Sequence, residues 1–202
     1  MSLQTLPSPA VLGAKSELNL YQKEWCGDNE VIKLSKMLLG NKKLSFLGFR
    51  NCKRVGDKGA QAIAKCLASE RGPSELRKLV FEFTQVGDLG AAALAHSIRA
   101  RPNSKLGRLD FGYCKVGDTG AAKLAEAIAV NPPFLKTLVL DYCKSITDAG
   151  ATALLAALDR NTHLTILGIK GTATSANMKK AMEMKLTRAA IARRAAQERV
   201  SH

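Results

Sequence analysis

The chain has 202 residues, of which 46% are hydrophobic and 5% aromatic, and its formal net charge is +14. No stretch approaches the roughly 18 consecutive apolar residues of a membrane span, and the N-terminal residues lack the hydrophobic core of a secretion signal. Five cysteines are few for the length, which is typical of a reducing compartment. These features argue against a membrane-spanning or secreted protein. They predict an intracellular one, in the cytoplasm or cytoskeleton or, as a further option, in the mitochondrion.

The chain divides into three predicted parts. Residues 1–16 contain two prolines and no periodic pattern, so we expect a flexible N-terminal segment. Residues 17–172 carry repeated strand and helix patterns and form the predicted repeat domain. Its first strand is expected within ELNLYQ (17–22) and its first, degenerate helix within CGDNEVIKLSKML (26–38). Residues 173–202 are predicted to form a basic helix that caps and extends the domain.

One helix motif recurs about every 30 residues. The copies are RVGDKGAQAIAKCL (54–67), QVGDLGAAALAHSI (85–98), KVGDTGAAKLAEAI (115–128) and SITDAGATALLAAL (145–158). Apolar residues at helical spacing, such as Ala121, Leu124 and Ile128, predict a buried helix face. We expect Asp118 to be the N-cap of its own helix, with its carboxylate accepting from backbone N–H groups. Gly120 is expected to let the helix approach its neighbour closely.

A period-two pattern precedes each helix motif and predicts a short strand. A strand–helix unit of this length cannot bury its apolar face alone, so successive units must stack. The pattern recurs in five aligned copies, which are Leu44–Leu47–Phe49–Cys52, Leu76–Leu79–Phe81–Thr84, Leu106–Leu109–Phe111–Cys114, Leu135–Leu138–Leu140–Cys143 and Leu164–Leu167–Ile169–Thr172.

The alternating pattern resembles the leucine-rich repeat, and its "VGDxGAxxLAxxL" helix resembles the ribonuclease-inhibitor-like class of that family. The resemblance covers roughly residues 17–172. It implies an α/β solenoid, with a curved parallel sheet on the concave face and helices on the convex face. It also implies that Cys52, Cys114 and Cys143 form an inward ladder that hydrogen-bonds loop backbone groups.

Catalytic and ligand sites are weakly supported. The cysteines repeat in equivalent positions, whereas a nucleophile needs one activated thiolate beside a base. The Gly-x-x-Gly turns hold an aspartate that would repel phosphate, and GYCKVGD (112–118) lacks the Lys-Ser/Thr of a phosphate-binding loop. Of the three histidines, His96 should be exposed, and no cluster has metal-ligand spacing. We therefore predict no enzyme activity, no cofactor, no metal and no small-molecule substrate.

The concave face is the first predicted partner site. Residues that alternate with the inward leucines should point to this face. They combine opposite charges with aromatic groups, which favours a protein partner over a continuous basic nucleic-acid groove. The predicted contact residues are Phe46, Arg50, Lys78, Glu82, Arg108, Asp110, Tyr113, Asp141, Tyr142 and Lys170.

The basic tail is the second predicted site. Residues 175–200 read as one long helix with Ser175 as a candidate cap, in which Met178, Met182 and Leu186 could cover the last repeat. Its cations could reach an acidic protein or a phosphate backbone, although a solvated helix end remains an alternative. These cations are Lys179, Lys180, Lys185, Arg188, Arg193, Arg194 and Arg199.

Two functions remain open at this point. The first is a non-enzymatic interaction module, a scaffold subunit of a larger eukaryotic assembly, with cytoskeletal and ciliary types among the options. Pointed-end actin caps of the tropomodulin type also place a helix after their last repeat. The alternative is an RNA-associated component of a ribonucleoprotein, such as an organellar ribosome, held by basic patches.

Overall fold

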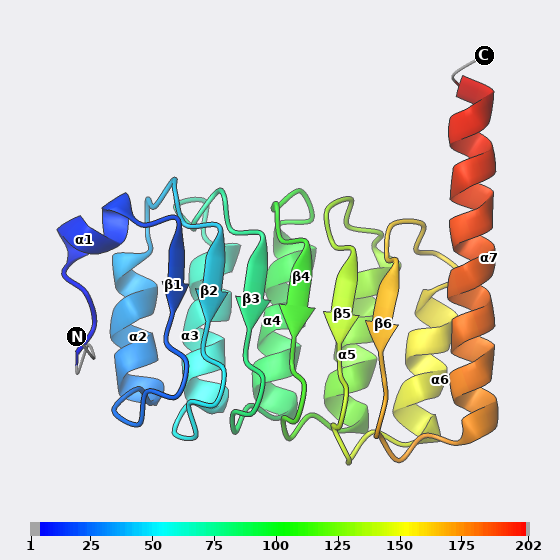
Figure 1. Ribbon diagram of the computed structural model, residues 1–202, viewed down its shortest axis with the longest axis horizontal. Helices are drawn as coiled ribbons and strands as arrows, with labels where there is room; N and C mark the ends of the chain where they lie inside the picture. The colour runs from blue at the N-terminus through cyan, green and yellow to red at the C-terminus, as the bar shows by residue number, and fades with distance from the viewer. Residues whose placement is uncertain (1–4, 201–202) are drawn as a thin grey trace.

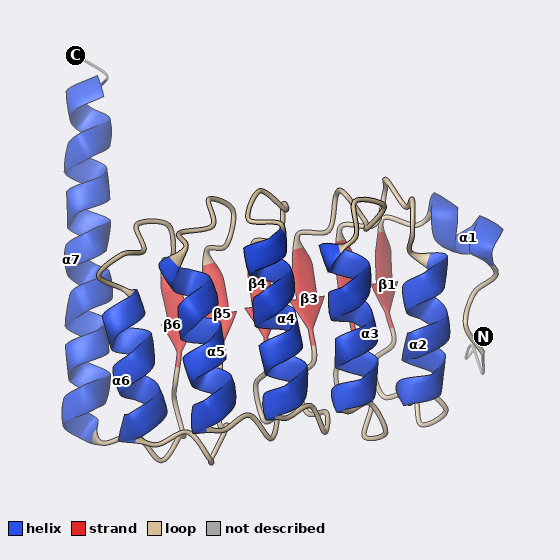
Figure 2. Cartoon of the chain, turned by 180° about the vertical axis from the view of Figure 1, so that it is seen from behind, coloured by secondary structure: helices blue, strands red, loops and turns tan. Residues whose placement is uncertain are grey.

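The computed structural model describes residues 5–200, with side chains as far as Arg194. Six parallel strands form one sheet in sequence order, from β1 to β6 (Figure 1). Helices α2 to α6 cover one face of this sheet, which Figure 2 shows from behind. This arrangement confirms the predicted solenoid of alternating strands and helices. None of the helices in residues 5–200 is long and apolar enough to span a membrane.

Each strand contains three residues, and the leucine at its centre points into the core. Leu47 is in register with Leu79, and Leu79 with Leu109, so that identical side chains stack along the solenoid. The strands are β1 (Glu17–Asn19), β2 (Phe46–Gly48), β3 (Lys78–Val80), β4 (Arg108–Asp110), β5 (Thr137–Val139) and β6 (Ile166–Gly168).

The helices follow the predicted motifs and are α2 (Asp28–Met37), α3 (Asp57–Ala68), α4 (Asp88–Ala100), α5 (Asp118–Ala129), α6 (Asp148–Ala157) and α7 (Ala176–Val200). The segment predicted to be flexible contains one further helix, α1 (Pro9–Ala14). Its Leu12 is fully buried, and its carbonyl accepts from the side-chain amide of Asn41 (3.3 Å). The N-terminal segment therefore packs against the first repeat.

Two stacks run through the core between the layers. The rings of Phe49, Phe81 and Phe111 are stacked, with centroids 5.2 and 5.9 Å apart. The expected cysteine ladder is also present, and each thiol donates to a backbone carbonyl of the preceding repeat. The Sγ of Cys114 lies 3.1 Å from the Phe81 oxygen, and the Sγ of Cys143 lies 3.1 Å from the Phe111 oxygen. These cysteines are therefore rungs of the framework.

The aspartates that open the helices serve a different helix from the one predicted. Asp118 is the first helical residue of α5, and Gly117 occupies the N-cap position without a side-chain hydrogen bond. The carboxylate of Asp118 instead accepts from the backbone N–H groups of Thr147 (2.8 Å) and Gly150 (2.9 Å) in the next repeat. The prediction that Asp118 caps its own helix is wrong, because the first turns of neighbouring helices lie close enough for the carboxylate to reach across.

Candidate protein-binding face

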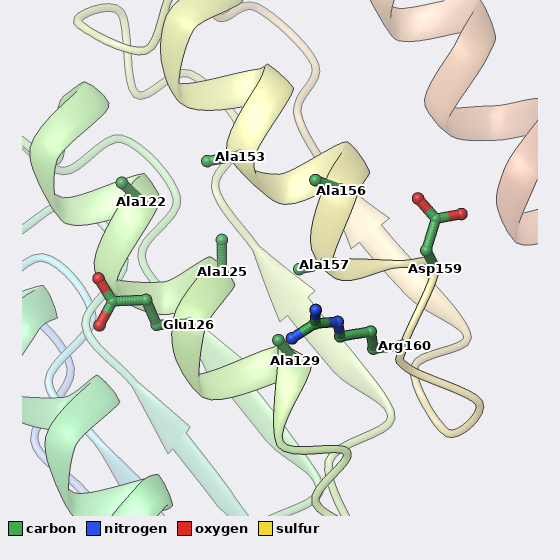
Figure 3. Close-up of a pocket in the computed structure, with 9 residues that line it drawn as sticks. All are labelled: Ala122, Ala125, Glu126, Ala129, Ala153, Ala156, Ala157, Asp159 and Arg160. Carbon is green, nitrogen blue, oxygen red and sulfur yellow. The ribbon is translucent and has the colours of Figure 1, made fainter.

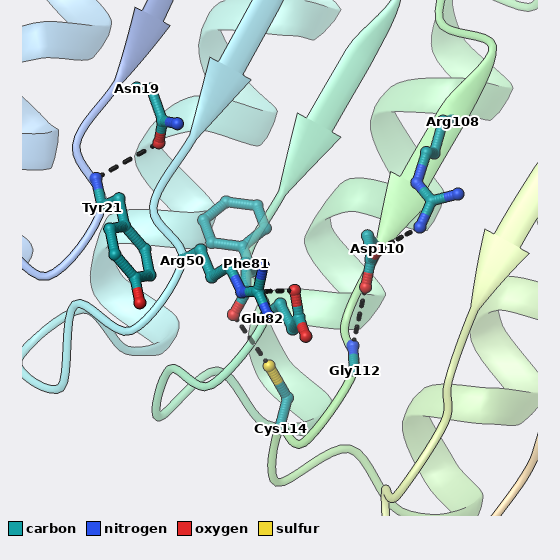
Figure 4. Close-up of polar contacts among 9 residues, drawn as sticks. All are labelled: Asn19, Tyr21, Arg50, Phe81, Glu82, Arg108, Asp110, Gly112 and Cys114. Carbon is teal, nitrogen blue, oxygen red and sulfur yellow. Dashed lines mark hydrogen bonds and ion pairs between the residues drawn. The ribbon is translucent and has the colours of Figure 1, made fainter.

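The uncovered face of the sheet, here called the sheet face, carries two ion pairs. Arg50 Nε lies 2.9 Å from Glu82 Oε2, and Arg108 Nη2 lies 2.6 Å from Asp110 Oδ2 (Figure 4). Asp110 also accepts from the Gly112 N–H (2.9 Å), and its side chain is only 6% exposed. Asp110 is therefore largely committed to the fold, whereas the side chains of Arg50 and Arg108 are 52% and 40% exposed.

The remaining charged positions of the sheet face differ in their freedom to bind. Asp141 is half-buried, and its carboxylate accepts from the Lys170 N–H (2.7 Å). Lys78 and the Lys170 ammonium are exposed, and no ion pair to either is found in residues 5–194. Burial raises the pKa of the Glu82 carboxyl, opposed by the charge of Arg50. The face therefore presents mainly cations at its rim and keeps its acids partly covered.

Three aromatic residues form a ladder at the strand ends, where the chain turns toward the helices. The ring centroids of Phe83 and Tyr113 lie 4.0 Å apart, and those of Tyr113 and Tyr142 lie 4.3 Å apart. Both pairs are stacked, and the middle ring is 42% exposed. We call Phe83, Tyr113 and Tyr142 the aromatic ladder.

All three residues of the aromatic ladder adopt left-handed backbone conformations, with φ values of 58°, 57° and 59°. The neighbouring repeats place Asn51 and Gly171 at the same position, which are residue types that tolerate this conformation. A bulky residue with positive φ is an outlier that costs about 1–2 kcal/mol. The stacked rings therefore persist at a position where glycine or asparagine would be less strained.

A small cavity lies at the end of the aromatic ladder. Its volume is about 190 Å³, and its lining is Tyr21, Arg50, Asn51, Lys53 and Phe83. The Lys53 ammonium lies 5.3 Å from the centroid of the Phe83 ring, and the Arg50 guanidinium lies 5.9 Å from that of Tyr21. Each cation therefore lies over one aromatic ring. We call this cavity the end pocket.

The basic helix α7 uses part of its charge to attach itself to the last repeat. The Lys185 ammonium contacts Asp159 and donates to the Leu155 carbonyl (3.2 Å), while Arg193 donates to the Thr162 (2.8 Å) and Leu164 (3.0 Å) carbonyls. Lys179 likewise donates to the Thr172 carbonyl (3.2 Å). These three predicted partner residues face the solenoid.

Three further cations of α7 are exposed to solvent. Lys180, Arg188 and Arg194 are exposed, and the side chain of Arg199 lies outside the described residues. The last turns of α7 project beyond the two layers (Figure 1). As predicted, the Ser175 hydroxyl accepts from the Met178 N–H (3.3 Å), and Met182 is buried against the final repeat.

A groove of about 510 Å³ lies on the helix face between α5 and α6 (Figure 3). Its walls are six alanines, with Glu126, Asp159 and Arg160 at the rim. The small side chains of the two helices leave this space between them. The groove carries few polar groups that could orient a ligand.

The buried thiols of Cys114 and Cys143 lack the properties of a nucleophile. Burial raises the pKa of the Cys114 thiol to about 11 and that of the Cys143 thiol to about 12. Because the thiolate is the nucleophilic form, these cysteines are poorly reactive near neutral pH. No group of three metal-ligating side chains occurs among the residues described.

Comparison with known proteins agrees with this architecture. The family model described as "Leucine Rich repeat" matches residues 40–64, 103–125 and 131–155. Together with the six strand–helix units, these matches decide the classification. The chain is a leucine-rich-repeat protein. Its units of about 30 residues are those of the ribonuclease-inhibitor-like class.

Two solved structures share the fold of this leucine-rich-repeat protein. The tropomodulin C-terminal domain from Caenorhabditis elegans superposes with a TM-score of 0.65 at 17% identity, over 88% of this chain and 100% of that chain. The structure of "Leiomodin-1 Actin-Binding Site 2 (ABS2)" gives a TM-score of 0.56 at 16% identity, over 96% of this chain and 90% of that chain. At such identities the likeness concerns the fold alone. No match to the leucine-rich-repeat protein is found among curated protein sequences.

The fold brings most of the sequence-predicted residues onto one surface. Arg50, Lys78 and Arg108 lie on the sheet face as expected, and Phe46 is half-buried over Gly48. Of the five residues that line the end pocket, only Arg50 was among the predicted contact residues. Three aromatic residues at one repeat position are a signal that could have identified the ladder. Its left-handed backbone could not be predicted, because phenylalanine and tyrosine do not favour that conformation.

Proposed function

We propose that this leucine-rich-repeat protein is a non-enzymatic protein-binding module, a scaffold subunit of a larger eukaryotic assembly of cytoskeletal type. One partner binds the sheet face. A second partner binds the outward side of α7, through Lys180, Arg188 and the last turns that carry Arg199.

The observation that carries the proposal is the aromatic ladder. Exposed tyrosines beside arginines are the groups most enriched at the centre of protein interfaces. Here, a strained backbone holds the rings in a continuous stack, and Arg50 lines the same pocket as Phe83 at the end of this stack. Asparagine would form the same turn with less strain. We therefore propose that the aromatic residues are retained at this position because they bind a partner.

The cytoskeletal part of the proposal is tested with actin, because the similar leiomodin structure is that of an actin-binding site. Co-sedimentation of the purified protein with actin filaments, and its effect on filament elongation, would be measured. An Arg50→Glu/Glu82→Arg exchange preserves the possibility of an ion pair but reverses the surface pattern. Combined with Lys78→Glu, it should weaken binding at least about tenfold, a loss of about 1.4 kcal/mol.

A matched control lies on the opposite layer. Lys65→Glu changes an exposed residue of α3 on the helix face and should leave actin binding unchanged. Equal loss in both variants would contradict binding through the sheet face. Failure of the unmodified protein to bind actin would overturn the cytoskeletal assignment, and the sheet-face variants would then be tested on the partner that co-purifies.

A second candidate function, binding of RNA in a ribonucleoprotein, is supported by the net charge of +14 and by exposed Lys180 and Arg188. If phosphate contacts dominate, affinity for an oligonucleotide should fall steeply between about 50 and 200 mM salt. Affinity that is insensitive to salt, or unchanged in a chain ending before residue 186, would contradict this alternative.

A further inference from the structure

The aromatic ladder stops where one more ring would fit. Phe83, Tyr113 and Tyr142 occupy the same repeat position in three consecutive units, and Asn51 occupies it in the unit before them. The ring face of Phe83 that looks away from Tyr113 therefore lies toward the end pocket. Adjacent strands are separated by roughly 4.8 Å, which is close to the spacing of stacked rings. The end pocket thus lies at the place of a missing rung.

The charges around the end pocket are predominantly positive. Lys53 is exposed, and no carboxylate pairs with it in residues 5–194. Arg50 has one ion pair, with the half-buried Glu82, and its side chain is 52% exposed. A planar guanidinium can bind a second carboxylate through its remaining N–H groups. An anionic group at the mouth of the pocket would therefore meet two cations.

The size of the end pocket limits what it can hold. A cavity of about 190 Å³ has room for one side chain, and its lining includes the aromatic residues Tyr21 and Phe83. A helix or a folded surface would not enter it. A flat ring would stack on Phe83 and extend the aromatic ladder by one member, and aromatic pairs of this kind contribute about 0.5–1.5 kcal/mol beyond burial.

We propose that the end pocket binds an aromatic side chain of a partner protein that is flanked by carboxylates. The ring stacks on Phe83 in the place of the missing rung and displaces the Lys53 ammonium, which lies 5.3 Å from the centroid of that ring. The neighbouring carboxylates then pair with Lys53 and Arg50. This inference rests on the proposed function, because it assigns the partner chemistry at one end of the sheet face. It adds a recognition rule, which is an aromatic residue within an acidic segment.

The test uses a short blocked peptide in which one tyrosine stands between aspartates, titrated into the full chain by calorimetry. The decisive variant is Asn51→Tyr, which supplies the missing rung from the chain itself and so fills the pocket. Its matched control is Asn51→Gly, which tolerates the positive φ of this position without adding a ring. Asn51→Tyr should bind the peptide at least about tenfold more weakly than Asn51→Gly, because only the tyrosine fills the pocket.

Peptide variants separate the two parts of the recognition rule. Replacing tyrosine with leucine, or the aspartates with asparagines, should each weaken binding several-fold. Lys53→Met should remove most of the effect of the aspartates. Thermal unfolding of every variant, followed by circular dichroism, establishes that the chain is folded when binding is measured.

Three results would overturn the inference. The first is that Asn51→Tyr and Asn51→Gly bind the peptide with equal affinity. The second is that the unmodified chain binds the leucine and tyrosine peptides with equal affinity. The third is that a single-stranded oligouridine binds more tightly than the peptide and displaces it. The last would show base stacking on Phe83 by RNA instead. If the unmodified chain does not bind the peptide but binds a partner through Lys78 and Arg108, this inference alone is rejected. The proposed function would then still stand.

Discussion

Asp88 belongs to α4 but caps the start of α5, since its Oδ1 accepts from the Gly117 N–H at 2.7 Å and from the Gly120 N–H at 2.9 Å. The same pair of bonds joins Asp57 to Gly87 and Gly90. Backbone donors at a helix start otherwise lack partners. Each aspartate therefore stabilises the interface between two repeats, which is where a solenoid acquires its cooperativity.

Removing one of these carboxylates should weaken the whole solenoid. We expect Asp88→Ala to lower the free energy of unfolding by about 1–3 kcal/mol, because two backbone donors at the interface lose a charged acceptor. The measurement is urea unfolding followed by circular dichroism. Glu126→Ala is the control, since the ion pairs of Glu126 are exposed and its removal should change stability much less than the removal of Asp88. Similar losses in both variants would argue against the inter-repeat cap.

The Asp118 carboxylate should make stability depend on pH. Burial tends to raise the pKa of this carboxyl, but hydrogen bonds from Thr147 and Gly150 outweigh burial and hold the pKa below its usual value. Because the folded pKa is the lower one, the stabilisation is present above the ordinary aspartate pKa of about 3.9 and is lost as pH falls through the folded pKa. Urea unfolding between neutral and acidic pH would measure this dependence.

Asp118→Asn provides the comparison for this pH dependence. Its stability deficit relative to the unmodified chain should be largest near neutral pH and should shrink on acidification. A deficit that is constant with pH would show that ionisation of Asp118 does not contribute.

The helix glycines are required by the position of the same carboxylates. A Cβ atom at Gly120 would lie 2.6 Å from Asp88 Oδ1 and 2.9 Å from Val116 Cγ1. We expect Gly120→Ala to destabilise the protein by more than about 1 kcal/mol, although alanine is the better helix former. Gly13→Ala is the matched control, because nothing lies within 4 Å of its Cβ position. Thermal unfolding of the two variants would distinguish crowding from helix propensity. A Gly120→Ala variant that is more stable than the unmodified chain would contradict the crowding explanation.

The repeat pattern was sufficient to predict the strands, the helices and the inward leucines, because each depends on local periodicity that recurs along the chain. It also predicted the close approach at Gly120. It did not predict which helix Asp118 serves, since an aspartate at a helix start satisfies the capping pattern for either of two neighbours. That choice depends on the distance between repeats, which the sequence does not state.

On the binding face, the sequence likewise predicted which side of the sheet a residue lies on, but not which residue it contacts. Alternation placed Arg50 and Arg108 on the sheet face, but their pairing with Glu82 and Asp110 depends on side-chain reach. Likewise, Lys185 and Arg193 are part of a basic helix in sequence, yet the packing of α7 turns both toward carbonyls of the last repeat. The sequence charge therefore overestimated how many basic side chains of α7 are available to a partner.

Tyr113 allows backbone strain and ring stacking to be measured separately. Tyr113→Ala removes both stacking contacts but keeps a side chain at a φ of 57°, whereas Tyr113→Gly removes the contacts and the strain. We expect the glycine variant to be more stable than the alanine variant by about 1–2 kcal/mol, the cost of a left-handed residue. Urea unfolding of the two variants would measure this difference.

The same pair of variants links strain to binding. Because two stacked contacts of about 0.5–1.5 kcal/mol each are lost as the strain is relieved, Tyr113→Gly should lie within about 2 kcal/mol of the unmodified chain. Both variants should nevertheless lose affinity for a sheet-face partner to the same extent. An alanine variant as stable as the glycine variant would show that the backbone is not strained at Tyr113, and full binding by either would remove the aromatic ladder from the interface.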